Sequence, residues 1–203
     1  WEEALPIGNG RIAAMVFGDP QLEQIQLNEE TVSAGSPYQN YNEEAKAALP
    51  EMRRLIFEGK YEEAQNMAAT KILSQVGNEM PYQTVGRLNI RYQDHKKVNN
   101  YYRDLDISNA VAVTRYKVDG VEFTEETFAS FTDQLVIRHI KSSKPGAINC
   151  ELFFNTPMRD PKRSIYGKKG LRLEGITHGS RYFPGKVHYS ADLDVKNKGG
   201  EVT

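Results

Sequence analysis

The pattern of hydrophobic and polar positions divides the chain into three regions. In the first, residues 1 to about 40, short apolar runs alternate with turn signals. The segment 12–17 is a compact apolar run that ends at Gly18, and Ile25 and Leu27 then alternate with polar amides and acids. Alternation with a period of two is typical of a half-buried strand, so we expect short strands in this region.

The second region, residues 42–73, changes to helical spacing. Its apolar residues recur at intervals of three and four positions, which gathers them on one helix face; the first of these are Ala45, Ala48, Leu49, Met52, Leu55 and Ile56. Proline lacks a backbone N–H and suits the first turn of a helix, so we expect a break at Pro50 and a new helix beginning there. Gly59 ends that helix, and a further apolar face follows. The region is predicted to form a helical hairpin.

The third region, from residue 82 onward, consists of strand after strand. Asp119-Gly120 separates two alternating segments and is a dipeptide that favours a type I′ hairpin turn. Residues 187–195 form the most regular alternation in the chain. Many strands at short spacing, without interleaved helices, indicate an antiparallel sandwich. The predicted fold is therefore mainly β, with a helical hairpin inserted near residues 42–73.

The end of the sequence predicts a continuation. Residues 194–203 have the pattern of a strand, a Gly199-Gly200 turn and the first residues of a return strand. An unpaired strand at a sheet edge promotes aggregation, and natural domains usually cover it. We expect residues 1–203 to be a single domain that is truncated at its C-terminal end.

Composition and charge exclude several classes of partner. The 203 residues include 26 basic and 27 acidic residues, for a formal net charge of −1. This balance provides no large positive field for nucleic acid or anionic lipid. No apolar stretch approaches the roughly 20 residues of a membrane helix, and no signal peptide is visible. The single Cys150 excludes an internal disulfide, and its alternating context favours a buried strand thiol.

The common catalytic and metal-binding patterns are absent from the sequence. The four histidines stand far apart, so their spacing predicts no metal site, and no cofactor is expected. Glycosidases need two carboxylates across a sugar bond. The adjacent pairs Glu29-Glu30 and Glu125-Glu126 would each point to opposite faces of a strand, so neither is a natural catalytic pair.

Two polar segments are the candidate binding residues. Asn9 lies between two glycines and is followed closely by Arg11, and a second cluster at Asn28 and Glu29 ends a strand pattern. Amides and guanidinium groups are effective hydrogen-bond partners for sugar hydroxyls and carboxylates. The alternative is that both segments are turns with capping hydrogen bonds.

These residues also carry a family resemblance. The opening Trp-Glu-Glu-Ala-Leu-Pro-Ile-Gly-Asn-Gly-Arg-Ile-Ala-Ala-Met-Val-Phe-Gly and the later Ile-Gln-Leu-Asn-Glu-Glu-Thr are its most specific segments. Further matches, in the same order along nearly the whole chain, are Leu49-Pro50-Glu51-Met52-Arg53, Phe57-Glu58-Gly59-Lys60-Tyr61, Tyr82-Gln83, Gly86-Arg87-Leu88, Tyr102-Arg103-Asp104-Leu105-Asp106 and Phe128-Ala129-Ser130. In these segments the chain resembles the N-terminal part of glycoside hydrolase family 95.

The resemblance implies an α-L-fucosidase, in a family where some members act on the related sugar L-galactose. Such enzymes join an N-terminal β super-sandwich through a linker to a separate (α/α)6 barrel. They invert the anomeric centre with an acid that protonates the leaving oxygen and a base that activates water. Both groups belong to the barrel, which these residues do not resemble, so no catalytic residue is expected in this chain.

The resemblance also implies partners and a location. The partners are the enzyme's own C-terminal barrel and its glycan substrate, and the location is periplasmic or secreted. Asn9, Arg11, Asn28 and Glu29 then become candidates for a domain interface or for the substrate rim. One departure concerns sugar recognition: members commonly show Leu-Trp-Ser-Gly-Gly-Pro where residues 32–37 are Val-Ser-Ala-Gly-Ser-Pro, so an aromatic is missing. Another is Arg87, which stands where an acidic residue is usual.

Two other functions stay open at this point. A free-standing carbohydrate-binding module or lectin also uses a β-sandwich, and measurable affinity of the chain for a fucoside would favour it. A structural sandwich with a protein partner would be favoured by a large exposed apolar patch. In the hydrolase interpretation, that patch is where the barrel docks.

Overall fold

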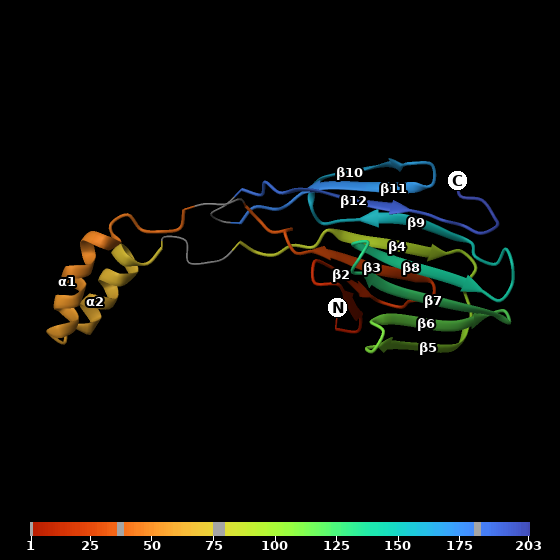
Figure 1. The fold of residues 1–203 in the computed structure, drawn as a ribbon, viewed down its shortest axis with the longest axis horizontal. Coiled ribbons are helices and arrows are strands. Elements are labelled where there is room, and N and C mark those ends of the chain that lie inside the picture. The colour runs from red at the N-terminus through yellow and green to blue at the C-terminus, as the bar shows by residue number, and fades with distance from the viewer. Residues whose placement is uncertain (1, 36–38, 75–79, 181–183) are drawn as a thin grey trace.

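The computed structural model describes residues 2–35, 39–74, 80–180 and 184–203. It confirms a mainly β fold whose strands form three antiparallel sheets. The helices lie together at one end of the long axis, apart from the sheets (Figure 1). The predicted helical insertion and the antiparallel sandwich are both confirmed. No helix in these described ranges is both long and apolar enough to cross a membrane.

The strands that precede and follow the helical insertion share one five-stranded sheet. Its order is β1 (Leu5–Gly8), β2 (Ile12–Val16), β3 (Leu22–Glu29), β4 (Gly86–Tyr92) and β9 (Cys150–Asn155). A four-stranded sheet contains β5 (Val98–Asp106), β6 (Val111–Val118), β7 (Val121–Ser130) and β8 (Leu135–Ser142). A three-stranded sheet contains β10 (Arg159–Tyr166), β11 (Gly170–Ile176) and β12 (His188–Asp194).

The turn between β6 and β7 confirms the hairpin that the Asp-Gly dipeptide predicts. Asp119 and Gly120 have φ of +48° and +82°, and Val118 faces Val121 across the turn. Positive φ at both central residues defines a type I′ turn, whose twist matches that of the flanking strands. Local sequence therefore fixes the register of this pair.

The apolar core lies on the inner face of the five-stranded sheet. Ile25, Ile90 and Phe154 supply it from β3, β4 and β9, and each is at most 3% exposed. Ala112 of β6 and Leu173 of β11 belong to the same cluster, so both other sheets pack against this face. Burying each large apolar side chain contributes roughly 1.5–3 kcal/mol. The apolar residues of the alternating segments thus form the interior of the sandwich.

A charged cluster, whose members the sequence pattern does not bring together, is buried in this interior. Arg138 of β8 donates to Glu23 of β3 at 2.7 Å and also to Glu125 of β7. The side chains of the two glutamates are 0% and 1% exposed, and that of the arginine is 7% exposed. The hydroxyl groups of Tyr92 and Tyr116 donate to Glu125 at 2.7 and 2.5 Å. These five residues, the buried charge cluster, connect the five-stranded and four-stranded sheets.

The helical insertion departs from the prediction at its proline. It consists of α1 (Ala45–Phe57), α2 (Tyr61–Met67) and a π-helical turn η1 (Ala68–Ile72). The expected break at Pro50 is wrong, because α1 continues through it. Pro50 and Lys46 are both exposed, so water can bond the Lys46 carbonyl that has lost its helical donor. Gly59 ends the helix as predicted, with φ of +75°.

The end of the chain also differs from the expected hairpin. β12 ends at Asp194, and within the described residues no strand forms between 195 and 203. Val195 still donates to the Lys169 carbonyl at 3.2 Å, so the chain follows β11 for one residue further. Residues 198–200 form a bend, and residues 201–203 that follow it are not in a strand.

Candidate functional site

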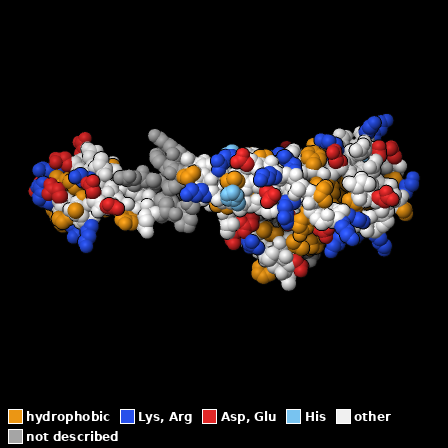
Figure 2. Space-filling model, turned by 90° about the horizontal axis from the view of Figure 1, so that it is seen from above, with side chains coloured by type: hydrophobic (Ala, Val, Ile, Leu, Met, Phe, Trp, Pro, Cys, Tyr) orange, Lys and Arg blue, Asp and Glu red, His pale blue; other side chains and the backbone are white. Residues whose placement is uncertain are grey.

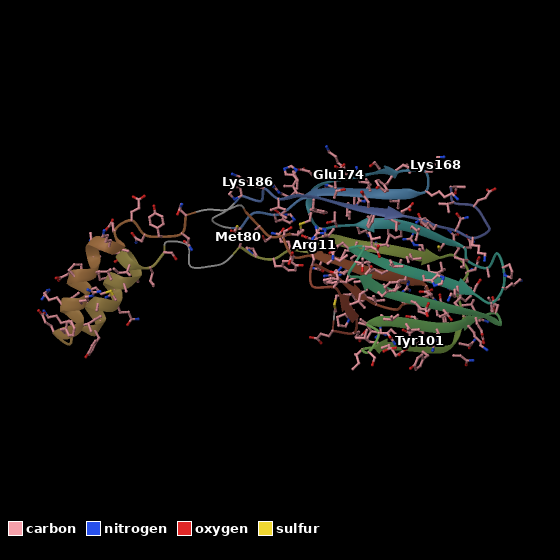
Figure 3. The ribbon with its side chains drawn as sticks, in the orientation of Figure 1. Arg11, Met80, Tyr101, Lys168, Glu174 and Lys186 are labelled. Atoms are coloured by element: carbon pink, nitrogen blue, oxygen red, sulfur yellow. The ribbon has the colours of Figure 1, made fainter. Side chains whose placement is uncertain are left out.

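The candidate residues lie where the β1–β2 hairpin meets the end of β3. In the ladder between β2 and β3, Ile12 faces Glu29 and Ala13 faces Asn28. This register brings the turn at residues 8–12 beside the polar end of β3. Figure 3 shows Arg11 at the end of the sandwich that faces the helices.

Arg11 and Glu29 form the charged part of the site. The Arg11 Nε donates to Glu29 Oε1 at 3.1 Å, and the Arg11 side chain is 55% exposed. The second oxygen of Glu29 accepts from the backbone N–H of Thr31 at 2.8 Å and from its hydroxyl at 2.5 Å. Partial burial acts to raise the pKa of Glu29, but the hydrogen bonds of Thr31 and Arg11 together lower it. An ionised carboxylate of this kind is a poor general acid.

The side chain of Asn9 forms hydrogen bonds within the β1–β2 turn. Its Oδ1 accepts from the backbone N–H of Arg11 at 3.1 Å and from that of Ile12 at 2.9 Å. Its Nδ2 donates to the carbonyl of Ser130, at the end of β7, at 2.8 Å. Asn9 therefore closes the β1–β2 turn and attaches it to the four-stranded sheet, as the turn alternative predicts.

Asn28 faces away from the other three candidates. Neighbouring residues of a strand point to opposite faces, so Asn28 lies on the outer face of the five-stranded sheet and Glu29 on the inner one. Asn28 is half-buried, and no hydrogen bond among the described residues engages its amide. The structure brings Arg11 and Glu29 together, places Asn9 behind them, and leaves Asn28 on another surface.

A shallow hollow adjoins Arg11. Its volume is about 310 Å³, and it is lined by Gly8, Gly10, Arg11, Ile12, Ala13, Glu30 and Tyr82. Tyr82 is 54% exposed and follows the helical insertion, where it pairs in a single bridge with Ser33. The sequence singled out Tyr82 only as part of a family match. An exposed phenol ring beside a guanidinium group offers an apolar face with polar groups around it.

The two described carboxylates that share one arginine are closed to a ligand. Glu23 and Glu125 approach the same arginine, but they are buried, so no substrate reaches them. Among the residues that the structure describes, no group of three His, Cys, Asp or Glu side chains could hold a metal ion. Cys150 lies in β9, where burial raises the pKa of its thiol, as expected for an unreactive strand cysteine. At the end that carries Arg11 and Glu29, the described groups can bind and position a ligand.

Two glutamates of β3 predict opposite pH dependences of stability. Burial raises the pKa of Glu23 above its ordinary 4.5, an effect that Arg138 only partly offsets. Its contribution is therefore fully present below the unfolded pKa and is lost as pH rises through the folded pKa. The pKa of Glu29 is lowered, so its contribution is present above 4.5 and is lost as pH falls through the folded pKa.

Between about pH 3 and pH 7, rising pH should increase the stability of Glu23→Gln relative to the unmodified protein and decrease that of Glu29→Gln, the second change falling below about pH 5. Urea unfolding of the three proteins across this range measures both slopes. Slopes of equal sign would contradict the assignment.

Comparison with known proteins places the chain in a family. The model for the glycosyl hydrolase family 65 N-terminal domain matches residues 1–203. The alpha-L-fucosidase 2 of Arabidopsis thaliana is 39% identical over 161 residues, which are 78% of this chain and 19% of that protein. A probable alpha-fucosidase A of Aspergillus niger is 27% identical over 147 residues, 69% of this chain and 18% of its own length.

The chain thus spans about a fifth of the length of these relatives. The matches confirm the resemblance to the N-terminal part of α-L-fucosidase-type glycoside hydrolases. The chain belongs to the family of glycosyl hydrolase family 65 N-terminal domains.

Proposed function

We propose that this chain is the non-catalytic N-terminal portion of an inverting α-L-fucosidase-like hydrolase of family 95. Its substrates are fucosylated or L-galactosylated glycans, and its location is periplasmic or secreted. The end of the sandwich that carries Arg11 and Glu29 packs against the (α/α)6 barrel and braces the rim of its active site.

The observation that carries this proposal is the similarity to alpha-L-fucosidase 2, which covers most of this chain and about a fifth of that protein. Three described carboxylates agree with it, because Glu23 and Glu125 are buried against Arg138 and Glu29 is already held by Thr31 and Arg11. Retaining and inverting glycosidases both need two carboxyl groups that reach the sugar. The catalytic pair then belongs to the rest of the polypeptide, and this domain supplies position.

Arg11→Ala in the full-length hydrolase tests the bracing role. Only Nε of the guanidinium is engaged among the described residues, so its two terminal nitrogens are free to bind a barrel carbonyl or a substrate hydroxyl. Loss of a charged hydrogen bond predicts a fall of about tenfold or more in kcat/KM for a fucoside. The exposed side chain predicts a change below about 0.5 kcal/mol in the free energy of unfolding.

Asn9→Ala is the matched comparison, because Asn9 acts within the fold. The variant loses the hydrogen bonds of Asn9 to the Ile12 N–H and to the Ser130 carbonyl, which is expected to cost about 1 kcal/mol in the free energy of unfolding. Unchanged kcat and KM for a fucoside in the Arg11 variant would exclude the bracing role.

A second candidate function has one observation in its favour. The outer face of the five-stranded sheet presents amides, an arginine and an aromatic ring side by side, from Gln24, Gln26, Asn28, Arg87 and Phe153. Gln24 already bonds Asn89 at 3.3 Å and accepts from Arg87 at 3.4 Å. Such a face suits direct glycan binding by a lectin-like module. Affinity of the 203-residue chain for a fucosylated oligosaccharide, abolished by Gln26→Ala, would favour it.

A further inference from the structure

The helical insertion packs on itself and stands clear of the three sheets (Figure 1). Its own interior is small: the buried apolar residues described between 42 and 73 are Ala48, Leu55 and Ala64. Units below about 40 residues usually need disulfides, metals or association to stay folded. This segment contains no cysteine, and its described residues include no group that could hold a metal. Two alanines and one leucine are a small core for a unit of this size, which favours a contribution from another surface.

The apolar residues at the end of the insertion are exposed. Ile56, Phe57 and Tyr61, the hairpin tip, lie where α1 turns into α2 and are 40%, 88% and 69% exposed. Hydrophobic side chains are visible between charged ones on this part of the molecule in Figure 2. Aromatic residues dominate the binding energy of protein interfaces, and exposed apolar patches mark interaction sites. The composition of the hairpin tip is typical of residues that insert into a protein partner.

A network of ion pairs spans the hairpin tip. Arg54 donates to Glu51 at 2.7 and 2.5 Å and also to Glu58, and Lys60 contacts Glu58 at 3.0 Å. These exposed pairs contribute little stability individually. They lie on both sides of Phe57 and favour this turn geometry, which reduces the entropy that a partner must overcome on binding.

We propose that the hairpin tip inserts into an apolar cleft on the catalytic portion of the same hydrolase polypeptide. This inference rests on the proposed function and names the contact through which the domain is joined to the barrel. The relatives are about five times as long as this chain, so most of such a protein lies outside the residues described.

The position and charge of the insertion fit this occupant. The insertion leaves and rejoins the sandwich beside the Ser33–Tyr82 bridge, at the end that carries the Arg11 hollow, so one partner can contact both. Residues 42–73 carry six acidic and five basic side chains, which provides no field for an anionic membrane or for nucleic acid. The six are Glu43, Glu44, Glu51, Glu58, Glu62 and Glu63, and the five are Lys46, Arg53, Arg54, Lys60 and Lys71.

Photo-crosslinking in the full-length hydrolase tests the contact. The photoreactive p-benzoylphenylalanine replaces Phe57, whose ring it retains, and in a matched control it replaces the exposed Lys46 at the base of α1. We expect the probe at 57 to crosslink within one polypeptide to a peptide that follows residue 203, and the control to give no such product. A crosslink between two copies, a crosslink to the sandwich, equal products from both positions, or no product at 57 would each overturn the inference.

Hydrogen exchange supplies an independent measurement. The double variant Phe57→Ser with Tyr61→Ser should speed amide exchange of residues 45–72 by about tenfold or more, while Lys46→Ser with Glu62→Ser leaves it unchanged. Equal exchange in both variants would contradict docking.

The fucosidase activity of the full-length protein separates the two proposals. Activity without the crosslink removes the docking inference alone. The crosslink without activity on fucosides leaves docking in place and removes the proposed substrate.

Discussion

Replacing Arg138 with methionine is expected to lower the free energy of unfolding by about 3–5 kcal/mol. The change leaves Glu23 and Glu125 buried without their shared cation, and burying an unpaired carboxylate is costly. Methionine fills the space of the aliphatic stem, so the loss reports charge more than volume. The shift in the urea midpoint near pH 7, at constant slope, measures the effect.

Arg91→Met is the matched control. Arg91 pairs with Glu151 at 2.9 Å, and both side chains are 52% exposed. A surface pair of this kind contributes at most about 1 kcal/mol. Equal costs at the two positions would show that the buried charge cluster does not hold the sheets together.

Neutralising both acids in the background of Arg138→Met should recover stability. Glu23→Gln with Glu125→Gln removes the buried charges that the first change leaves unpaired. Pairs within one network are not additive, so the triple variant should be more stable than Arg138→Met alone. A triple variant that is less stable would assign the loss to packing instead of charge.

The alternation of the strands indicates that Glu23 and Glu125 are buried, but it does not show which charged residues contact each other. Glu23 shares the inward phase of β3 with Ile25, and Glu125 shares the inward phase of β7 with Phe123. A charge in the apolar phase is a signal of burial. Which charges meet depends on the pairing of sheets, and the sequence separations of 13 and 115 residues from Arg138 carry no information about that.

The elements with strong local signals were predictable. The alternating segments became strands, and the Asp119-Gly120 turn formed as its dipeptide indicates. The helical region was found, but the break at Pro50 was not, because its cost depends on whether water reaches the unpaired carbonyl. Local sequence does not report that exposure.

The candidate site was predictable only in part. An asparagine that closes a turn and one that binds a ligand look the same in the sequence. They differ only in the groups to which the side-chain amide hydrogen-bonds. Asn9 bonds Ser130, which is 121 positions away, and this contact decides in favour of the turn. Arg11 and Glu29 meet because β2 and β3 are neighbours, as expected of strands joined by a short connection. Tyr82 lines the hollow although the whole helical insertion separates it from β3 in the sequence, so local pattern does not predict its place there.

Gly86→Ala is expected to cost about 2–6 kcal/mol, because two independent effects add. Gly86 has φ of +144°, a conformation that residues with a side chain rarely adopt. A Cβ built there would also lie 2.6 Å from the carbonyl oxygen of Asn155 and 3.3 Å from Leu173, so the start of β4 would have to move away from β9. Thermal or urea unfolding measures the sum.

Gly120→Ala separates the two effects of Gly86→Ala. Gly120 also has positive φ, at +82°, but a Cβ there would meet nothing within 4 Å. Its cost should be that of the backbone alone, about 1–2 kcal/mol. The excess at Gly86 then combines its less accessible φ with the close approach of β4 to β9 and to Leu173 of β11. Equal losses at the two glycines would mean that this contact relaxes freely, and that the Gly-Arg-Leu segment is constrained by its backbone conformation and not by the packing of the sheets.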